Sequence, residues 1–167
     1  MHGNRFTGII LFSALIAFLA FGFSRDCSAQ FSGPVTSTSA YSVPESQRME
    51  PAALAKLLQA ASGDPPVMLQ VGSHIMFAQS HIPGSVFAGP GSQSSGLHLV
   101  ETKVVSTPRS KLIVIYCGCC PWDRCPNIGP AYKRLRELGF TNVKALYLAD
   151  NFGNDWVAKG YPTDKGE

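Results

Sequence analysis

The chain has 167 residues, with 14 Lys and Arg against 11 Asp and Glu, so its formal net charge is +3. This length suits a single domain with a hydrophobic core of its own. Because the charge is small and scattered, the composition argues against the clustered basic face of a nucleic-acid-binding protein, and we expect no nucleic-acid partner.

The amino-terminal segment, residues 1–29, has the layout of a secretory signal. Arg5 supplies a positive charge, residues 9–23 are almost entirely apolar, and small residues precede a cleavage site after Ala29. An uncleaved membrane anchor is the alternative, but the apolar stretch is shorter than the roughly 20 residues that a membrane-spanning helix needs. We therefore expect cleavage, and a periplasmic or secreted protein without stable membrane insertion. Cleavage lowers the basic residues from 14 to 12 and the acidic residues from 11 to 10.

Composition divides the remaining chain into a linker, a domain and a tail. Residues 30–48 are rich in Ser, Thr, Pro and Gly and predict a flexible linker. The domain spans residues 49–163, and residues 164–167 form a short tail. Apolar residues recur at helical spacing after Pro51, which predicts an amphipathic helix that stops by Gly63.

The first half of the domain alternates short apolar runs with turn residues. Residues 67–71 predict a buried strand, and residues 73–79 fit one or two helical turns. After a turn at residues 81–85, residues 86–88 predict a second strand, and residues 89–96 have the composition of a loop.

The second half of the domain carries the clearest patterns. Residues 97–105 fit either a helix or irregular structure, whereas residues 112–116 are apolar on both faces, as in the centre of a parallel sheet. A helix is predicted from Asn127, a good N-cap, to a stop at Gly139, and residues 143–148 predict a further strand. Strands that alternate with helices indicate an α/β domain with a mainly parallel sheet.

The cysteines gather in one loop, between the predicted central strand and the helix after it. Cys27 leaves with the signal, and the four that remain lie within nine residues: Cys117, Cys119, Cys120 and Cys125. Ligands of parallel α/β sheets bind at the carboxyl ends of strands, beside the free N–H groups of the next helix. Cys117 occupies that position, where the helix dipole favours the thiolate that attacks sulfur. Arg124 adds a positive charge that can hold an anion.

Four short motifs follow one another along the domain. They are His-Ile-Pro-Gly at 81–84, Ile-Tyr-Cys at 115–117, Leu-Arg-Glu-Leu-Gly-Phe at 135–140 and Trp-Val-Ala-Lys-Gly-Tyr-Pro at 156–162. In this order they resemble landmarks of the rhodanese-like domain family. The resemblance implies a three-layer α/β fold, in which a central, mainly parallel sheet is flanked by helices. It also implies that Cys117 takes a sulfane sulfur from a donor such as thiosulfate, holds it as a persulfide and passes it on.

The chain departs from the family's pattern at three places. The loop after Cys117 is several residues longer than the compact Cys-x-x-Gly-x-Arg loop of active members. Gln70 stands where an acidic residue is common, and Asp150 and Asn151 replace paired glycines. The resemblance therefore supports the fold more strongly than it supports standard activity.

These features together predict an exported sulfurtransferase or persulfide carrier. It would move sulfur from a small-molecule or protein donor to a thiol acceptor, with no cofactor and no bound metal. Cys117 is the expected sulfur acceptor, and Cys120 or Cys125 can resolve the persulfide. Arg124 and the loop amides are expected to hold an anionic donor. Four further loop residues are expected to contact the substrate: Gly118, Cys119, Trp122 and Asn127.

Three other functions fit the same cysteines. Cys117 and Cys120 form a C-x-x-C pair, which is typical of a thiol–disulfide oxidoreductase. A non-catalytic domain whose loop is stapled by disulfides is also consistent with an oxidising compartment. The spacings of Cys117, Cys120 and Cys125 fall within those of zinc ligands, although four thiolates in one short loop would be crowded.

Overall fold

The computed structural model describes residues 42–60 and 63–166, which lie in one compact unit, Thr36–Glu167. The expected signal, residues 1–29, lies outside the described residues. Within the described part of the chain, no helix combines the length and the apolar character that crossing a membrane requires.

Both ends of the described chain join the domain. Of the segment expected as a linker, Val43 is buried, Glu45–Gln47 form a 3₁₀ turn and Arg48 begins the first strand. In the segment expected as a tail, Asp164 exchanges two backbone hydrogen bonds with His81, at 3.0 and 2.9 Å. The N–H of Gly166 donates to the carbonyl of Ala78 at 2.9 Å. The carboxyl-terminal segment is therefore tied to the helix that ends just before His81.

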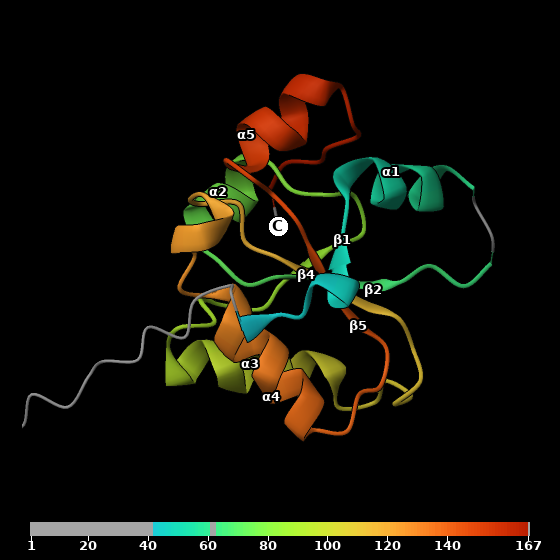
Figure 1. Ribbon diagram of the computed structural model, residues 1–167, viewed down its shortest axis with the longest axis vertical. Helices are drawn as coiled ribbons and strands as arrows, with labels where there is room; N and C mark the ends of the chain where they lie inside the picture. The colour runs from blue at the N-terminus through green and yellow to red at the C-terminus, as the bar shows by residue number, and fades with distance from the viewer. Residues whose placement is uncertain (1–41, 61–62, 167) are drawn as a thin grey trace, which may run out of the picture. The chain divides into compact units, whose positions relative to one another are not determined.

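A parallel five-stranded sheet forms the centre of the described residues, with the strand order β1-β5-β4-β2-β3 (Figure 1). Its strands are β1 Arg48–Met49, β2 Val67–Gln70, β3 Val86–Phe87, β4 Ile113–Tyr116 and β5 Val143–Leu146. All of β4 is buried, because it is the middle strand and helices cover both of its faces. The predicted α/β domain with a parallel sheet is confirmed.

The α-helices of the described residues are α1 Pro51–Gln59, α2 His74–Gln79, α3 Ser94–Val104, α4 Ile128–Glu137 and α5 Phe152–Asp155. Helix α3 resolves the ambiguity over residues 97–105, and it begins inside the stretch predicted as a loop. Its first turn packs closely against Pro90, since a Cβ at Gly96 would lie 2.0 Å from the Pro90 carbonyl oxygen. The loop composition of residues 94–96 thus reflects a tight helix start.

Side-chain spacing explains where α4 forms and where it ends. Ile128, Ala131 and Leu135 recur three and four residues apart, and all three are buried on one face. After the last turn, Gly139 has a φ of +86°, and the N–H of Phe140 donates to the Leu135 carbonyl at 3.1 Å. This is a Schellman ending, which requires the left-handed backbone that glycine adopts without strain. The predicted stop at Gly139 is confirmed.

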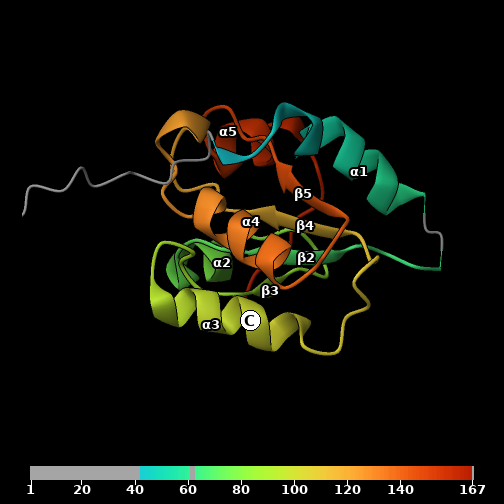
Figure 2. The ribbon, with the colours of Figure 1, turned by 60° about the horizontal axis from the view of Figure 1, so that its bottom comes forward.

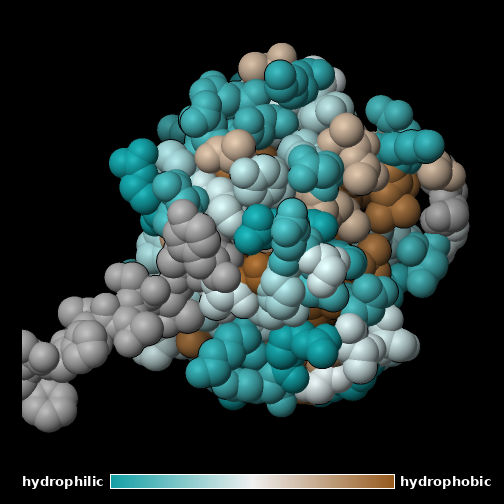
Figure 3. Space-filling model, viewed as in Figure 1, coloured by the Kyte–Doolittle hydropathy of each residue, from teal (hydrophilic) through white to brown (hydrophobic). Residues whose placement is uncertain are grey.

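Helices pack on both faces of the sheet, with α3 and α4 on one side and α1 and α5 on the other (Figures 1 and 2). Successive residues of β4 point to opposite faces, so Ile113 and Ile115 join one core cluster while Val114 and Tyr116 join the other. On the face drawn in Figure 3, apolar side chains occupy small areas among hydrophilic ones. Because the two core clusters lie on opposite faces of the sheet, the carboxyl end of β4 lies between them.

Candidate functional site

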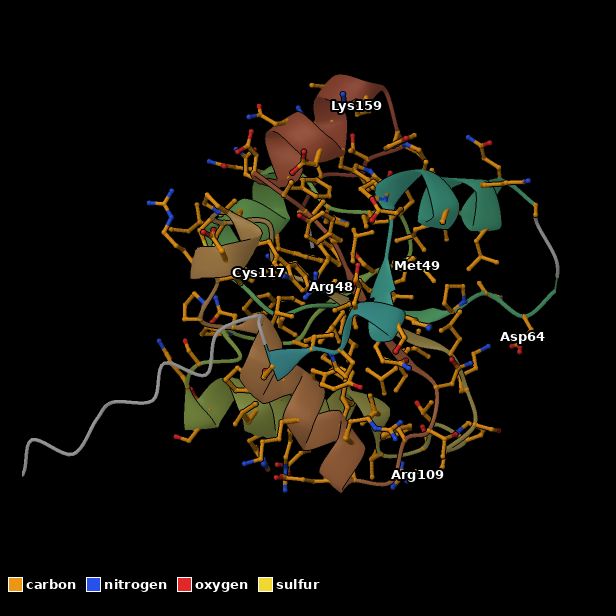
Figure 4. All side chains as sticks on the ribbon, in the orientation of Figure 1. Arg48, Met49, Asp64, Arg109, Cys117 and Lys159 are labelled. Atoms are coloured by element: carbon orange, nitrogen blue, oxygen red, sulfur yellow. The ribbon has the colours of Figure 1, made fainter. Side chains whose placement is uncertain are left out.

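The cysteine loop begins at the carboxyl end of β4, where Cys117 follows Tyr116 directly (Figure 4). Gly118 turns the chain with a φ of +75°, and its carbonyl accepts a hydrogen bond from the N–H of Phe152 at 3.1 Å. A Cβ at position 118 would lie 2.6 Å from the Cβ of Phe152. Glycine is therefore needed here both for the backbone conformation and for the close approach of α5.

The loop gathers its thiols into a cluster centred on Cys119. The Sγ of Cys119 lies 3.1 Å from the Sγ of Cys117 and 3.3 Å from the Sγ of Cys120. The Sγ atoms of Cys117, Cys119 and Cys125 all lie within 4.8 Å of one another. All four thiols are free. Cys119, expected from the sequence only as a substrate contact, is thus the central member of the cluster.

Asn127 fastens this cluster to the loop that precedes α3. Its Oδ1 accepts hydrogen bonds from the N–H of Ser92 at 3.1 Å and from the Oγ of Ser92 at 2.8 Å. Its Nδ2 donates to the Sγ of Cys117 at 3.3 Å and lies 3.9 Å from the Sγ of Cys119. Asn127 occupies the predicted N-cap position of α4, but its side chain makes no capping bond, because Ser92 engages its Oδ1 and the cysteine cluster engages its Nδ2.

Negative charge in the cluster is favoured on Cys119 rather than on Cys117. Hydrogen bonds from the thiols of Cys117 and Cys125 hold the pKa of Cys119 well below its ordinary value. Hydrogen bonds from Cys117 to Cys119 and to Cys125 raise the pKa of Cys117 above its ordinary range, and burial adds to the shift. These directions favour the thiolate on the exposed Cys119, two residues after the Cys117 at which the sequence predicts it.

The amino end of α4 does not stabilise a thiolate at Cys117. Its backbone amides, from Asn127 and Ile128, hydrogen-bond to Cys125, and not to Cys117 as the sequence predicts. Cys117 is only 3% exposed, so water does little to stabilise a charge there. The half-buried Cys120 likewise has a pKa above its ordinary value, chiefly because burial disfavours its thiolate.

Cys117, Gly118 and Cys119 line a cavity of about 370 Å³ beside the carboxyl end of β4. Apolar parts of its wall come from α2, α5 and the turn after α5, and polar parts come from β2 and the end of α2. The apolar residues are Met76, Phe152 and Val157, and the polar ones include Gln70, Gln79 and Ser80. Among the described residues that line it there is no Lys, Arg or His. The thiols therefore face a largely uncharged space.

The other predicted site residues lie behind or outside this cavity. Trp122 is buried, with its ring centroid 5.2 Å from that of Tyr147. Cys125 is buried, Cys120 is half-buried and Arg124 is exposed. The described residues that line the cavity include none of these four side chains. The structure thus brings the cysteines together but leaves Arg124 away from the space that Cys117 and Cys119 face.

Gln70 is a site residue that the sequence marks only as a departure from the family pattern. Its Nε2 donates to the carbonyl of Cys117 at 3.3 Å, and its Oε1 accepts from the N–H of Gly72 at 3.1 Å. It is a register partner of Tyr116 in the neighbouring strand, so its place at the end of β2 is the signal that could have identified it. Met76 and Phe152 carry no such signal, because helices distant in sequence bring them to the cavity.

Comparison with known proteins bears on the fold. No family model matches the sequence, and no curated protein matches it. The solved rhodanese-like domain of the Alr3790 protein from Anabaena sp. matches with a TM-score of 0.54 and 21% identity, over 71% of this chain and 79% of that one. The BH2092 protein from Bacillus halodurans matches with a TM-score of 0.56 and 20% identity, over 72% and 77% of the two chains.

A third solved structure is the thiosulfate sulfurtransferase from Pseudomonas aeruginosa. It matches with a TM-score of 0.55 and 19% identity, over 78% of this chain but 23% of the longer protein. The element order, the parallel sheet and these likenesses agree, and the fold expected from the four motifs is confirmed: this chain has the rhodanese-like fold.

Proposed function

We propose that this chain is an exported sulfurtransferase or persulfide carrier whose paired thiols Cys119 and Cys117 accept sulfane sulfur. The main support for the proposal is the position of Cys117 and Cys119. Two thiols line one cavity at the carboxyl end of the central strand, with their sulfurs 3.1 Å apart. One of them is exposed and the other is buried. That arrangement suits attack by the first thiol and a second step by its neighbour.

Cys119 makes the first attack in this proposal. Its thiolate attacks the outer sulfur of a donor that contains an S–S bond, and a new S–S bond forms to Cys119. The donor's S–S bond breaks, and the leaving group, a sulfite or a sulfinate, departs with the electron pair. Exposure of Cys119 at the cavity wall supports this role, because the thiolate is the reactive form and the donor must reach it.

Two outcomes are open to the persulfide on Cys119. An acceptor thiol in the cavity can take the outer sulfur, which completes a transfer cycle. Alternatively, the neighbouring Cys117 thiol attacks the inner sulfur, which forms a Cys117–Cys119 disulfide and releases the outer sulfur as hydrogen sulfide. The distance of 3.1 Å between the two sulfurs supports this second route.

The cavity wall also favours one class of donor. Thiosulfate carries two negative charges, and no Lys, Arg or His is among the described residues that line the cavity. Met76, Phe152 and Val157 offer apolar surface instead. The proposed donor is therefore an organic sulfane-sulfur compound with an apolar group and at most one charge, of which benzenethiosulfonate is a convenient probe.

Mass spectrometry of the loop peptide tests the assignment. The reduced protein is treated with benzenethiosulfonate, and wild type is compared with Cys119→Ser, Cys117→Ser and the matched control Cys120→Ser. We expect a gain of one sulfur atom in Cys117→Ser, which cannot resolve the persulfide, and none in Cys119→Ser. Wild type and Cys120→Ser are expected to show either that gain or the loss of two hydrogen atoms, with release of hydrogen sulfide. If Cys119→Ser gained the sulfur atom and Cys117→Ser did not, Cys117 would be the nucleophile. If no protein gained a sulfur atom, the proposal of sulfur transfer would be wrong.

Export is tested separately. Cell fractionation of the native host, followed by amino-terminal sequencing, is expected to recover from the periplasm or medium a protein that begins after Ala29. Recovery of the uncut chain from the membrane would favour the anchor instead.

A thiol–disulfide oxidoreductase is the second candidate, and the same contact of 3.1 Å between Cys117 and Cys119 favours it. The pair differs from the Cys117 and Cys120 pair that the sequence suggests, since the sulfur that Cys120 contacts is that of Cys119. This function requires reduction of a small-molecule disulfide that depends on both Cys117 and Cys119, with loss of two hydrogen atoms from the loop peptide and no gain of sulfur.

A further inference from the structure

Three cysteine sulfurs of the loop between β4 and α4 converge on one point. Cys117 directly follows β4, Cys119 lies in the loop, and Cys125 follows the 3₁₀ turn Trp122–Arg124 just before α4. Their Sγ atoms all lie within 4.8 Å of one another. We infer that these three residues bind one soft, thiophilic cation, Zn(II) or Cu(I), which goes beyond the proposed sulfur transfer.

The spacing of the sulfurs fits such an ion. A zinc–thiolate bond of about 2.3 Å places the sulfurs of a tetrahedral site about 3.8 Å apart. The closest pair here, Cys117 and Cys119, is at 3.1 Å, and the widest separation in the trio does not exceed 4.8 Å. Each sulfur therefore needs to move by about 1 Å or less to surround one ion.

The trio is held by the fold rather than by the loop alone. Cys117 is anchored because Gln70 Nε2 donates to its carbonyl, and the N–H of Cys125 donates to the Trp122 carbonyl at 3.3 Å. Both residues are buried, so their side chains have few alternative positions. Ligands fixed by the scaffold reduce the ordering that an ion must impose when it binds.

Hydrogen-bond donors surround the sulfurs in the way that outer partners support metal ligands. Asn127 Nδ2 lies 3.3 Å from the Sγ of Cys117 and 3.9 Å from that of Cys119. Backbone amides at the start of α4, from Asn127 and Ile128, hydrogen-bond to Cys125. Such N–H donors stabilise negative sulfur and orient it, which is the role of the outer shell in metal sites.

The thiol ligands also decide which ions are suitable. Thiolates are soft ligands that select Cu(I) and Zn(II) over Mg(II) or Ca(II). Each ligand that still carries its proton gives it to solvent as the metal–sulfur bond forms, so no oxidant or reductant takes part. Because Cys119 also lines the cavity, one side of the ion would remain open to a further ligand.

The experiment titrates the reduced full chain with Zn(II) alone, and separately with Cu(I) alone, under anaerobic conditions. All proteins carry Cys27→Ser, so that only the loop supplies thiols. Competition with a chromophoric chelator gives the affinity, and native mass spectrometry gives the stoichiometry. We expect one ion per chain, and a loss of affinity of about 100-fold or more when Cys125 or Cys119 is changed to Ser.

Cys120→Ser is the matched control, and its affinity is expected to stay within about threefold of wild type. Cys119→Ser removes an exposed sulfur and guards against the outcome in which the buried Cys125→Ser fails to fold. No stoichiometric binding of either ion by wild type overturns the site, and so does a loss in Cys120→Ser equal to that in Cys119→Ser. Persulfide formation is measured without metal, so the two proposals succeed or fail separately.

Discussion

Gly118 shows how one residue sets the shape of the candidate site. Its backbone has a φ of +75°, and its Cα faces the Cβ of Phe152 so closely that no side chain fits between them. Gly160 has almost the same backbone conformation, with a φ of +73°, but a Cβ there would meet nothing within 4 Å. Substitutions at the two glycines therefore distinguish the free-energy cost of a left-handed backbone from that of a steric clash.

We predict that Gly160→Ala lowers the free energy of unfolding by about 1 kcal/mol, the cost of the left-handed conformation for a residue with a Cβ. Gly118→Ala adds overpacking and should lower it by about 2 kcal/mol more. Urea denaturation measures both. Equal losses in the two variants would mean that α5 moves away freely, and that the loop is not held by this contact.

Also at the residue scale, the sequence predicted that the cysteines follow the central strand. It did not predict which of their sulfur atoms lie close together. The grouping depends on contacts with distant residues, such as Phe152 with Gly118 and Ser92 with Asn127. These contacts bend the loop so that Cys119 lies beside Cys117. Residue spacing carries no information about such a bend, because a loop with no helical or strand period has no fixed direction for its side chains.

At the scale of elements, strong periodic patterns were predictable, and so were the short elements β3 and α2, which turn residues flank, but β1 and α5 were not. The apolar run of β4 and the spacing of α4 gave both elements and the stop at Gly139. Strand β1 has two residues and α5 has four, so neither presents a pattern long enough to recognise. Helix α3 was obscured because its first turn contains Gly96, which reads as a loop residue until its contact with Pro90 is known.

The separation of the core into two clusters leads to a prediction about helices α1 and α4. Leu135 of α4 and Leu54 of α1 are fully buried in separate core clusters. Each change to Ala should lower the free energy of unfolding by about 2–5 kcal/mol, because it removes a buried side chain and leaves a cavity.

Since the clusters are separate, the double variant is expected to lose the sum of the two effects within about 0.5 kcal/mol. Denaturant unfolding of the two single variants and the double variant provides the measurement. An interaction energy well above that value would show that the sheet transmits repacking from one face to the other.

At the scale of the whole molecule, the cavity combines walls from β2, α2, the cysteine loop and α5, so it follows from the strand order. The sequence predicted that a ligand binds at the carboxyl end of the central strand. It did not predict which side chains meet there, because the neighbours of β4 are chosen by packing of the entire sheet. Arg124 illustrates the difference: it follows Cys117 closely in sequence, yet it is exposed and is not among the described cavity-lining residues.

The uncharged wall predicts a gain of function. Gln79 is exposed and lines the cavity, so Gln79→Lys places one positive charge near an incoming donor. At about 6 Å in water, one pair of unit charges is worth about 0.7 kcal/mol, or about threefold in rate. We expect kcat/KM to rise about tenfold for the thiosulfate dianion and about threefold for the benzenethiosulfonate monoanion, with both gains reduced by salt.

Gln59→Lys makes the same change of charge on the exposed end of α1, and it should leave both rates unchanged. Steady-state sulfur transfer to an acceptor thiol is the assay. Equal gains for the two donors, or equal gains in the two variants, would contradict the proposed uncharged cavity.

The backbone bonds that fasten Asp164 and Gly166 to His81 and Ala78 make the carboxyl-terminal segment a tether on α2. The same helix presents Met76 and Gln79 to the space in front of the thiols. The carboxyl-terminal segment and the cavity wall thus share one short helix, whereas the sulfurs are attached to β4 and to the start of α4. A substitution that breaks these backbone bonds would therefore act first on the side chains that a donor meets, and only then on the thiols.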